Sequence, residues 1–171
     1  FPKYVIRTDI TAFYESIPHK DLLRKVQRDN LLDLISKQIL RQILNEYERL
    51  SGSSIGVPRG IGVSAYLAEL YMRDFDDKVK LIPNLFYYGR YVDDIIAIFV
   101  PQSTVDPRDY LDSIDKILME KELVRNPLKT KEINLINNTV KHSIEYLGYS
   151  IEFGDGTVNI RISAKKVLKY R

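Results

Sequence analysis

The chain has 171 residues, 44% of them hydrophobic and 29% charged, and a net charge of only +3. This is enough for one domain with a buried core, and the composition is that of a soluble globular protein. No apolar run approaches the roughly 20 residues that cross a bilayer, and none is typical of a signal peptide. The absence of cysteine excludes disulfides and thiolate metal sites and is compatible with a cytoplasmic setting.

The chain begins with Phe1 rather than Met, which predicts a fragment or a processed product. The small positive charge does not by itself indicate a nucleic-acid partner. Basic residues do gather near the C-terminus, where no acidic residue interrupts them. A solvated tail is the simplest interpretation of this cluster. It consists of Arg161, Lys165, Lys166, Lys169 and Arg171.

The first third of the chain predicts a strand followed by two helices. Residues 3–10 alternate well enough to form a strand that ends near Asp9. Helices are predicted over residues 19–28 and 31–50. The second helix carries an apolar stripe, and we expect this stripe to face the core. Its members are Leu31, Leu34, Ile35, Ile39, Ile43, Leu44 and Tyr47.

The middle of the chain predicts a loop and then a helix. Residues 51–62 are rich in Gly and Ser, and Pro58 fixes the backbone within them. Residues 64–80 follow as a predicted helix, with Ser64 in the N-cap region.

A hairpin with an acidic tip comes next. Residues 86–91 and 95–100 are short aromatic and β-branched runs, and Asp93 and Asp94 lie between them. Residues 106–123 then predict an amphipathic helix with its apolar side turned inward.

The last third predicts strands and a basic helix. A strand is expected at residues 131–136, and a second hairpin is expected from residues 143–152 and 158–162 around a turn at 154–156. A final helix starts near Ala164. The order strand, helices, hairpin, helix, strand predicts an α+β fold, a ferredoxin-like βαββαβ antiparallel sheet with helices on one face, followed by a C-terminal β-hairpin.

Three carboxylates are placed to meet at one edge of that sheet. An Asp-Asp pair is by itself common turn composition. In the βαββαβ order, however, the first strand lies beside the hairpin, which brings Asp9 close to Asp93 and Asp94. Clustered carboxylates repel each other unless cations compensate. Oxygen ligands select Mg²⁺ or Mn²⁺, and two such ions roughly 3.5–4 Å apart can activate a hydroxyl and steady a leaving pyrophosphate.

The motifs around these acids resemble those of reverse transcriptases. Tyr91-Val92-Asp93-Asp94 resembles the YxDD box of that family, and residues 7–14 resemble its first palm motif. Further matches follow in the family's order. Residues 56–60 with Ser64 resemble the Pro-Gln-Gly loop and its helix, residues 126–130 resemble the Lys-Thr motif, and residues 146–149 resemble the primer-grip hairpin.

The resemblance implies the palm of an RNA-directed DNA polymerase that uses two Mg²⁺ ions, with Mn²⁺ as an alternative. Asp9, Asp93 and Asp94 would bind the metal ions together with the backbone carbonyl of Ile10. Lys129 would protonate the leaving pyrophosphate or steady a phosphate, and a solvated surface lysine is the alternative interpretation.

The resemblance also implies the residues that contact nucleotide, template and primer. An aromatic ring at Tyr14 would collide with a 2′-hydroxyl and so favour deoxynucleotides. Arg59 stands where the family usually has Gln, and either a contact to template phosphate or altered template handling fits this change. The residues assigned to nucleotide or template are Tyr14, Pro58, Arg59, Gly60, Ser64 and Tyr91, and the primer grip is assigned to Leu147 and Gly148.

The implied partners are an RNA template, a DNA primer and dNTPs, with no membrane and an undetermined oligomeric state. Residues 1–142 would form the palm core with a helical insertion at 19–50, residues 143–163 the primer-grip-like hairpin, and residues 164–171 the start of a thumb or linker. The fingers and the thumb lie outside this sequence, so we expect the fragment alone to polymerise poorly. The sequence of these motifs is similar to that of bacterial reverse transcriptases from group II introns, retrons and abortive-infection or phage-defence systems.

Three alternatives stay open on the sequence. The first is RNA-dependent RNA synthesis, and the second is template-independent or protein-primed DNA synthesis. The third is a non-catalytic palm that binds nucleic acid or a partner protein. Intact carboxylates at all three positions disfavour the third, because clustered negative charge weakens binding to phosphates.

Overall fold

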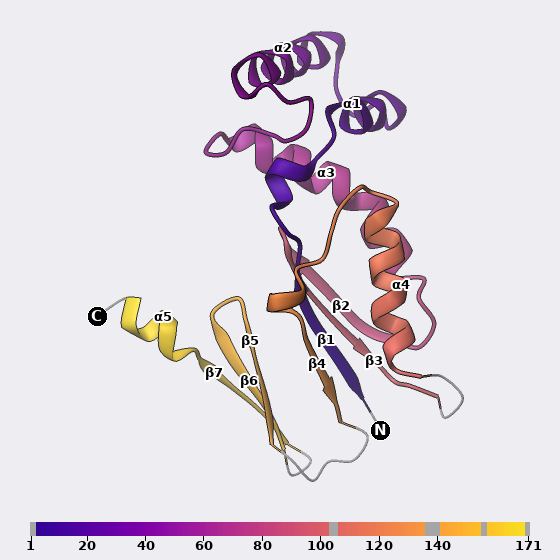
Figure 1. Ribbon diagram of the computed structural model, residues 1–171, viewed down its shortest axis with the longest axis vertical. Helices are drawn as coiled ribbons and strands as arrows, with labels where there is room; N and C mark the ends of the chain where they lie inside the picture. The colour runs from indigo at the N-terminus through magenta and orange to yellow at the C-terminus, as the bar shows by residue number, and fades with distance from the viewer. Residues whose placement is uncertain (1–2, 103–105, 136–140, 155–156, 170–171) are drawn as a thin grey trace.

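The computed structural model describes residues 3–102, 106–135, 141–154 and 157–169. Its main body is a four-stranded antiparallel sheet in the order β2-β3-β1-β4 (Figure 1). The four strands are β1 (Tyr4–Asp9), β2 (Leu85–Tyr91), β3 (Asp94–Phe99) and β4 (Lys131–Asn134). This is the strand order of a ferredoxin-like sheet, so the predicted α+β class and the βαββαβ connectivity are confirmed.

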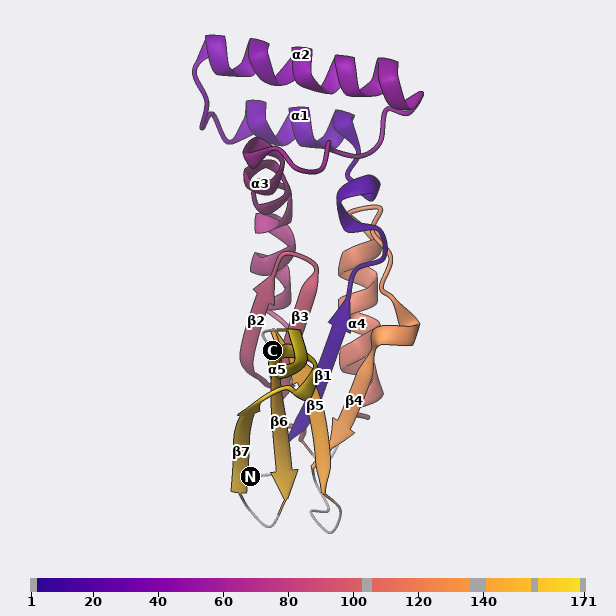
Figure 2. The same cartoon turned by 90° about the vertical axis from the view of Figure 1, so that its left-hand side faces the viewer.

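Helices α3 (Gly62–Val79) and α4 (Arg108–Met119) cover one face of this sheet (Figure 2). Because side chains alternate along a strand, Tyr4 and Ile6 of β1 enter the core beneath the helices, whereas Val5 joins a second core on the opposite face. The inward side of α4 is buried as its periodicity predicts. No described helix is long and apolar enough to cross a membrane.

A three-stranded sheet covers the opposite face, where the sequence predicts a single hairpin. Its strands are β5 (His142–Tyr146), β6 (Tyr149–Gly154) and β7 (Thr157–Ile162). The predicted continuous strand over 143–152 is therefore wrong. The chain reverses at Leu147 and Gly148, which both have positive φ, in a two-residue turn closed by the pair Tyr146 and Tyr149. The turn expected at 154–156 lies partly outside the described residues.

Helices α1 (His19–Arg28) and α2 (Leu34–Ser51) form a separate layer beyond the end of α3 (Figure 2). The predicted burial of the α2 stripe is wrong for most of its members, because the helix contacts α1 along a neighbouring line of residues. Leu34 is 71% exposed and Ile39 is 51% exposed, whereas Leu40 and Leu44 are buried.

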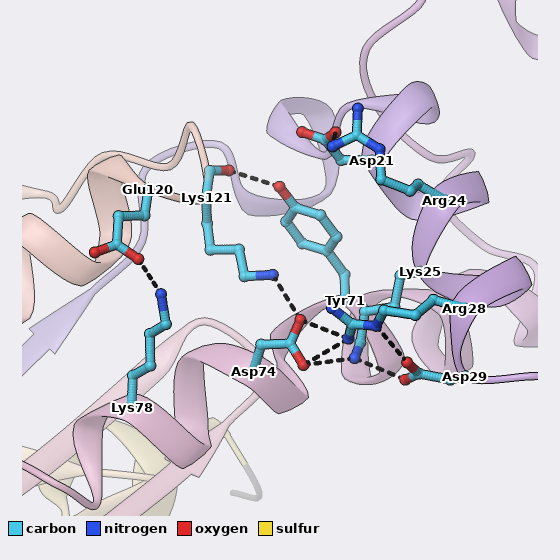
Figure 3. A network of polar contacts seen from close by, with 10 residues as sticks. All are labelled: Asp21, Arg24, Lys25, Arg28, Asp29, Tyr71, Asp74, Lys78, Glu120 and Lys121. Carbon is cyan, nitrogen blue, oxygen red and sulfur yellow. Dashed lines mark hydrogen bonds and ion pairs between the residues drawn. The ribbon is translucent and has the colours of Figure 1, made fainter.

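An ion-pair network joins α1 to α3 (Figure 3). The Lys25 ammonium lies 2.7 Å from Asp29 and 2.8 Å from Asp74, and its side chain is only 5% exposed. Arg28 and Lys121 also contact Asp74. We call these five residues the α1–α3 network. Breaking a buried pair leaves an uncompensated charge, so this network contributes to how α1 is fixed on α3.

The loop between α2 and α3 is fixed to the segment before α1. The amide of Gly56 donates to the Ile17 carbonyl, and the amide of Val57 donates to the Tyr14 carbonyl, both at 2.8 Å. Gly56 has φ +102°, and an added Cβ would lie 3.2 Å from the Glu15 backbone. Only glycine fits this position without strain. The loop is therefore ordered against Tyr14 rather than a free connector.

Candidate active site

The predicted acidic residues meet at one end of the four-stranded sheet. Asp9 is the last residue of β1 and Asp94 the first of β3, and the two are register partners in the antiparallel ladder. Asp93 lies in the two-residue turn of the β2–β3 hairpin, and its carbonyl accepts the Ile10 amide at 3.1 Å. We call Asp9, Asp93 and Asp94 the acidic tip.

Two basic side chains compensate part of this charge. Lys129 Nζ lies 3.0 Å from Asp9 Oδ2, and Arg7 forms an ion pair with Asp94. Sequence reasoning missed Arg7, although its place two residues before Asp9 puts both side chains on the same face of β1.

Burial raises the pKa of Asp93, and the charges of Asp9 and Asp94 raise it further. Like charges thus act on one another at the acidic tip, which is the electrostatic condition for cation binding.

Lys129 reaches Asp9 because its segment is bonded to β1. The Asn126 amide donates to the Asp9 carbonyl at 2.8 Å, and the hydroxyls of Thr8 and Thr130 are hydrogen-bonded at 2.8 Å. The short 3₁₀ helix η2 (Pro127–Lys129) lies between these two contacts. The predicted Lys-Thr motif is therefore attached to the first palm motif at both of its ends.

The donor set at the acidic tip fits a hard divalent cation. Across the described ranges, no group of three or more His, Asp or Glu side chains is already gathered closely enough to bind a metal. Arg7 and Lys129 occupy two of the carboxylates instead. The chemistry nevertheless fits, because carboxylate oxygens are the preferred ligands of Mg²⁺, and the pairing of Asp9 with Asp94 beside the turn that carries Asp93 brings three carboxylates to one end of the sheet.

A pocket of about 480 Å³ opens beside Asp93. Its lining includes Tyr14, Arg59, Gly60 and Ser64, so four of the residues predicted to bind nucleotide or template do lie together. Arg59 is largely exposed and lies 2.6 Å from Glu15. Partial burial acts to raise the pKa of Glu15, but the hydrogen bond from Arg59 lowers it overall.

Ser64 lies inside the first turn of α3 rather than at its N-cap, which is Ile61, so that part of the prediction is wrong. The Ser64 side chain is buried, with the residue 2% exposed, and its Oγ has no hydrogen-bond partner within the described part of the chain. A buried unsatisfied hydroxyl beside a pocket is a donor or acceptor available to a ligand.

The primer-grip residues line a second pocket of about 430 Å³ on the other side of the acidic tip. Leu147 and Gly148 face Arg7 and Asp94 there, and basic side chains of helix α5 (Ala164–Lys169) complete the lining. Pro58 and Tyr91 are not among the described residues that line either pocket. Tyr91 is the register partner of Asp94 at the end of β2 and is exposed.

An antiparallel ferredoxin-like sheet with helices behind it and clustered acids at one end defines the palm class of nucleic-acid polymerases. The profile of the family described as "Reverse transcriptase (RNA-dependent DNA polymerase)" matches residues 2–151. The chain therefore belongs to the reverse transcriptase family, as its motifs predict.

Solved structures of telomerase share this fold. The chain aligns with telomerase from Candida albicans, in complex with a fragment of telomeric RNA, over 98% of its length at 18% identity and a TM-score of 0.62. It aligns with apo telomerase from Candida tropicalis over 95% of its length at 15% identity and a TM-score of 0.65. It covers 33% of each of those chains.

A curated relative is similar over a shorter stretch. The uncharacterized 91 kDa protein in the cob intron of Schizosaccharomyces pombe is 31% identical over 87 residues, which are 48% of this chain and 11% of the relative. The chain thus spans a small part of the proteins that it resembles.

Proposed function

We propose that this chain is the catalytic palm of an RNA-directed DNA polymerase, which joins deoxynucleotides to a primer 3′-hydroxyl. The observation that carries the proposal is the acidic tip, where Asp9 and Asp94 are register partners and Asp93 lies in the adjoining turn. Membership of the reverse transcriptase family supports the same activity.

Asp9, Asp93 and Asp94 would bind divalent cations, Mg²⁺ or alternatively Mn²⁺, with the carbonyl of Ile10 as a further ligand. Such cations neutralise triphosphate charge and activate a hydroxyl nucleophile. Lys129, whose ammonium lies 3.0 Å from Asp9, would protonate the leaving pyrophosphate or neutralise it. Arg7 is the countercharge of Asp94 while no cation is bound.

The pocket beside Asp93 is our candidate nucleotide site. The Tyr14 ring lines it and would limit the space beneath the sugar, while the Ser64 hydroxyl, which has no hydrogen-bond partner among the described residues, would bond the ligand. Gly60 has φ +85°, and no atom of the described residues lies within 4 Å of an added Cβ, so its backbone would be open to the base pair formed with the template. Arg59 offers a cation to template phosphate from the rim of the pocket.

The opposite pocket is our candidate primer site. Lysines of α5 lie on its rim with Arg7, and cations neutralise backbone phosphates without reading sequence. Leu147 and Gly148 form the turn that faces Asp94, which suits contact with the last primer nucleotide. Fingers and thumb regions of the full-length protein would complete the grip on RNA template and DNA primer.

Primer extension by the full-length protein tests the proposal. We expect extension with dNTPs on an RNA template in the presence of Mg²⁺, much less with NTPs, and none by the Asp93→Asn variant with an unchanged fold. Preference for NTPs would indicate an RNA polymerase, and extension without template would indicate terminal or protein-primed synthesis. A biological activity that survives Asp93→Asn would indicate a binding module. A bacterial origin, a role in antiphage defence and a cytoplasmic setting stay predictions.

A further inference from the structure

A fully paired arginine lies directly behind the hairpin that carries Asp93. The Arg90 side chain is 4% exposed, on the helix-facing side of β2. All five of its N–H donors are used, in bonds of 2.7–2.9 Å to Asp76, Glu69 and the backbone carbonyl of Val92. Burial acts to lower the pKa of Arg90, but the two carboxylates raise it overall, so the guanidinium is charged.

The carbonyl that Arg90 bonds belongs to a strained residue. Val92 has φ +57°, a region that a β-branched side chain adopts only under constraint. Such a conformation persists only where its surroundings impose it. The turn is fixed from two sides. The Ile10 amide bonds the Asp93 carbonyl on the sheet side, and Arg90 bonds the Val92 carbonyl on the helix side.

The partners of Arg90 are themselves attached to a rigid element. Asp76 and Glu69 both lie on α3, on turns about two apart, and the Tyr88 hydroxyl donates to Asp76 at 2.6 Å. The planar guanidinium binds both carboxylates bidentately, which fixes its orientation as a lysine ammonium would not. The position of the Val92 carbonyl is thus fixed relative to α3, and not only by the exposed end of the hairpin.

We propose that Arg90 is a positioning residue of the active site. Because it binds both α3 and the Val92 carbonyl, it fixes the Val92–Asp93 turn relative to α3 and so determines the position of the Asp93 carboxylate for cation binding. This rests on the proposed function, because it assigns Arg90 a role in the same cation site. Arg90 touches neither a substrate nor a carboxylate of the acidic tip, and it acts through the backbone of Val92.

The α1–α3 network supplies a matched control on the same helix. Asp74 lies two residues before Asp76 and also accepts from several cations, but its contacts run to Lys25, Arg28 and Lys121 (Figure 3). Asp74→Asn therefore weakens a comparable cluster of ion pairs on α3 at a different place. A general loss of stability would appear in both variants, whereas a displaced Asp93 would appear only in Arg90→Lys.

The experiment measures three quantities on the full-length wild type and the two variants. These are Mn²⁺ binding without nucleotide by electron paramagnetic resonance, the Mg²⁺ concentration that half-saturates primer extension, and the melting temperature. For Arg90→Lys we expect Mn²⁺ affinity and kcat to fall by about 10- to 100-fold, which is the usual loss when a residue that orients a metal ligand is replaced. The KM for template–primer should be unchanged. For Asp74→Asn we expect a lower melting temperature with wild-type cation dependence.

Arg90→Lys with wild-type Mn²⁺ affinity would overturn the proposal, as would an equal loss of affinity in Asp74→Asn. If Arg90→Lys does not fold, Glu69→Gln replaces it, because Glu69 is the more exposed partner and its loss leaves Asp76 and Val92 bonded. The same shift, smaller in size, is then expected, and its absence would count equally against the proposal. A wild type that shows no cation-dependent extension defeats the proposed function itself, whereas an active wild type with an unaffected variant defeats only the role of Arg90.

Discussion

Two half-buried aspartates, Asp93 and Asp74, are in opposite electrostatic conditions. At the acidic tip, burial and the neighbouring charges of Asp9 and Asp94 raise the pKa of Asp93. In the α1–α3 network, burial acts in the same direction on Asp74, but hydrogen bonds from Lys25, Arg28 and Lys121 lower its pKa overall. The same residue type is thus surrounded by like charge in one place and by opposite charge in the other.

This difference in electrostatics distinguishes a candidate functional site, the acidic tip, from a structural cluster, the α1–α3 network. Charge paired as at Asp74 stabilises the fold, whereas like charge that is compensated only in part, as at the acidic tip, is tolerated mainly where function requires it. Substitutions at the acidic tip should therefore change activity with little loss of stability, and substitutions in the α1–α3 network should do the reverse. The following variants test that separation in order of expected effect.

Lys129→Ala should lower kcat of the full-length protein by about 100-fold at saturating Mg²⁺, because a positioned proton donor contributes at least that much. Single-turnover primer extension measures it. Lys131→Ala, an exposed lysine at the start of β4, is the control. Equal activity of the two variants would show that Lys129 has no part in catalysis, and it would contradict the expectation that changes beside the acidic tip affect activity.

Tyr14→Ala should reduce the preference for dNTPs over NTPs by about 10- to 100-fold, since the pocket beside Asp93 would then admit a 2′-hydroxyl. Competitive incorporation of dNTP and NTP measures the change. Tyr14→Phe keeps the ring and should behave as wild type. An unchanged preference in Tyr14→Ala would leave that residue as a packing aromatic against Phe13.

Asp74→Asn should lower the free energy of unfolding by about 2 kcal/mol at pH 7, because buried Lys25 loses one of its two carboxylate partners. The folded pKa of Asp74 is lowered, so its stabilising effect is present above the unfolded value of about 3.9 and is lost as pH falls below it. Denaturant unfolding at several pH values measures this. The difference between variant and wild type should shrink in acid, and a constant difference would contradict the ion-pair account.

Ile39→Gln should change the free energy of unfolding by less than about 0.5 kcal/mol, because its side chain on α2 is exposed. Leu44→Ala, on the buried line of the same helix, should cost about 3 kcal/mol. Chemical denaturation of both variants measures the contrast. A large loss in Ile39→Gln would mean that the exposed stripe is covered in solution.

Connectivity made the acidic tip predictable from sequence. The alternation of residues 3–10 and the hairpin signal around Asp93 identify strands, and the βαββαβ order makes β1 and β3 neighbours. Once these strands pair, Asp9 must lie near Asp94. The Lys-Thr motif identified Lys129 as a candidate. Its contact with Asp9, however, depends on hydrogen bonds of Asn126 and Thr130 that no sequence pattern predicts.

Other features depended on packing that local patterns do not encode. Two apolar lines run along α2, and periodicity alone does not say which one α1 covers. The ion pairs of Arg7 and Arg90 join residues far apart in the chain. The missed turn at Leu147 did leave a signal, because apolar positions change from even numbers to odd numbers there, and such a phase change marks a reversal.

Cation mapping on the full-length protein tests the central claim most directly. In the presence of hydrogen peroxide and ascorbate, Fe²⁺ that replaces Mg²⁺ reduces the peroxide to hydroxide and a hydroxyl radical, and the radical cuts the backbone near the bound ion. We expect cuts at residues 9–10 and 92–94 together, and we expect excess Mg²⁺ and the Asp93→Asn substitution to suppress them. Cuts at other places, or cuts at these places that neither Mg²⁺ nor the substitution affects, would contradict a shared cation site at the acidic tip.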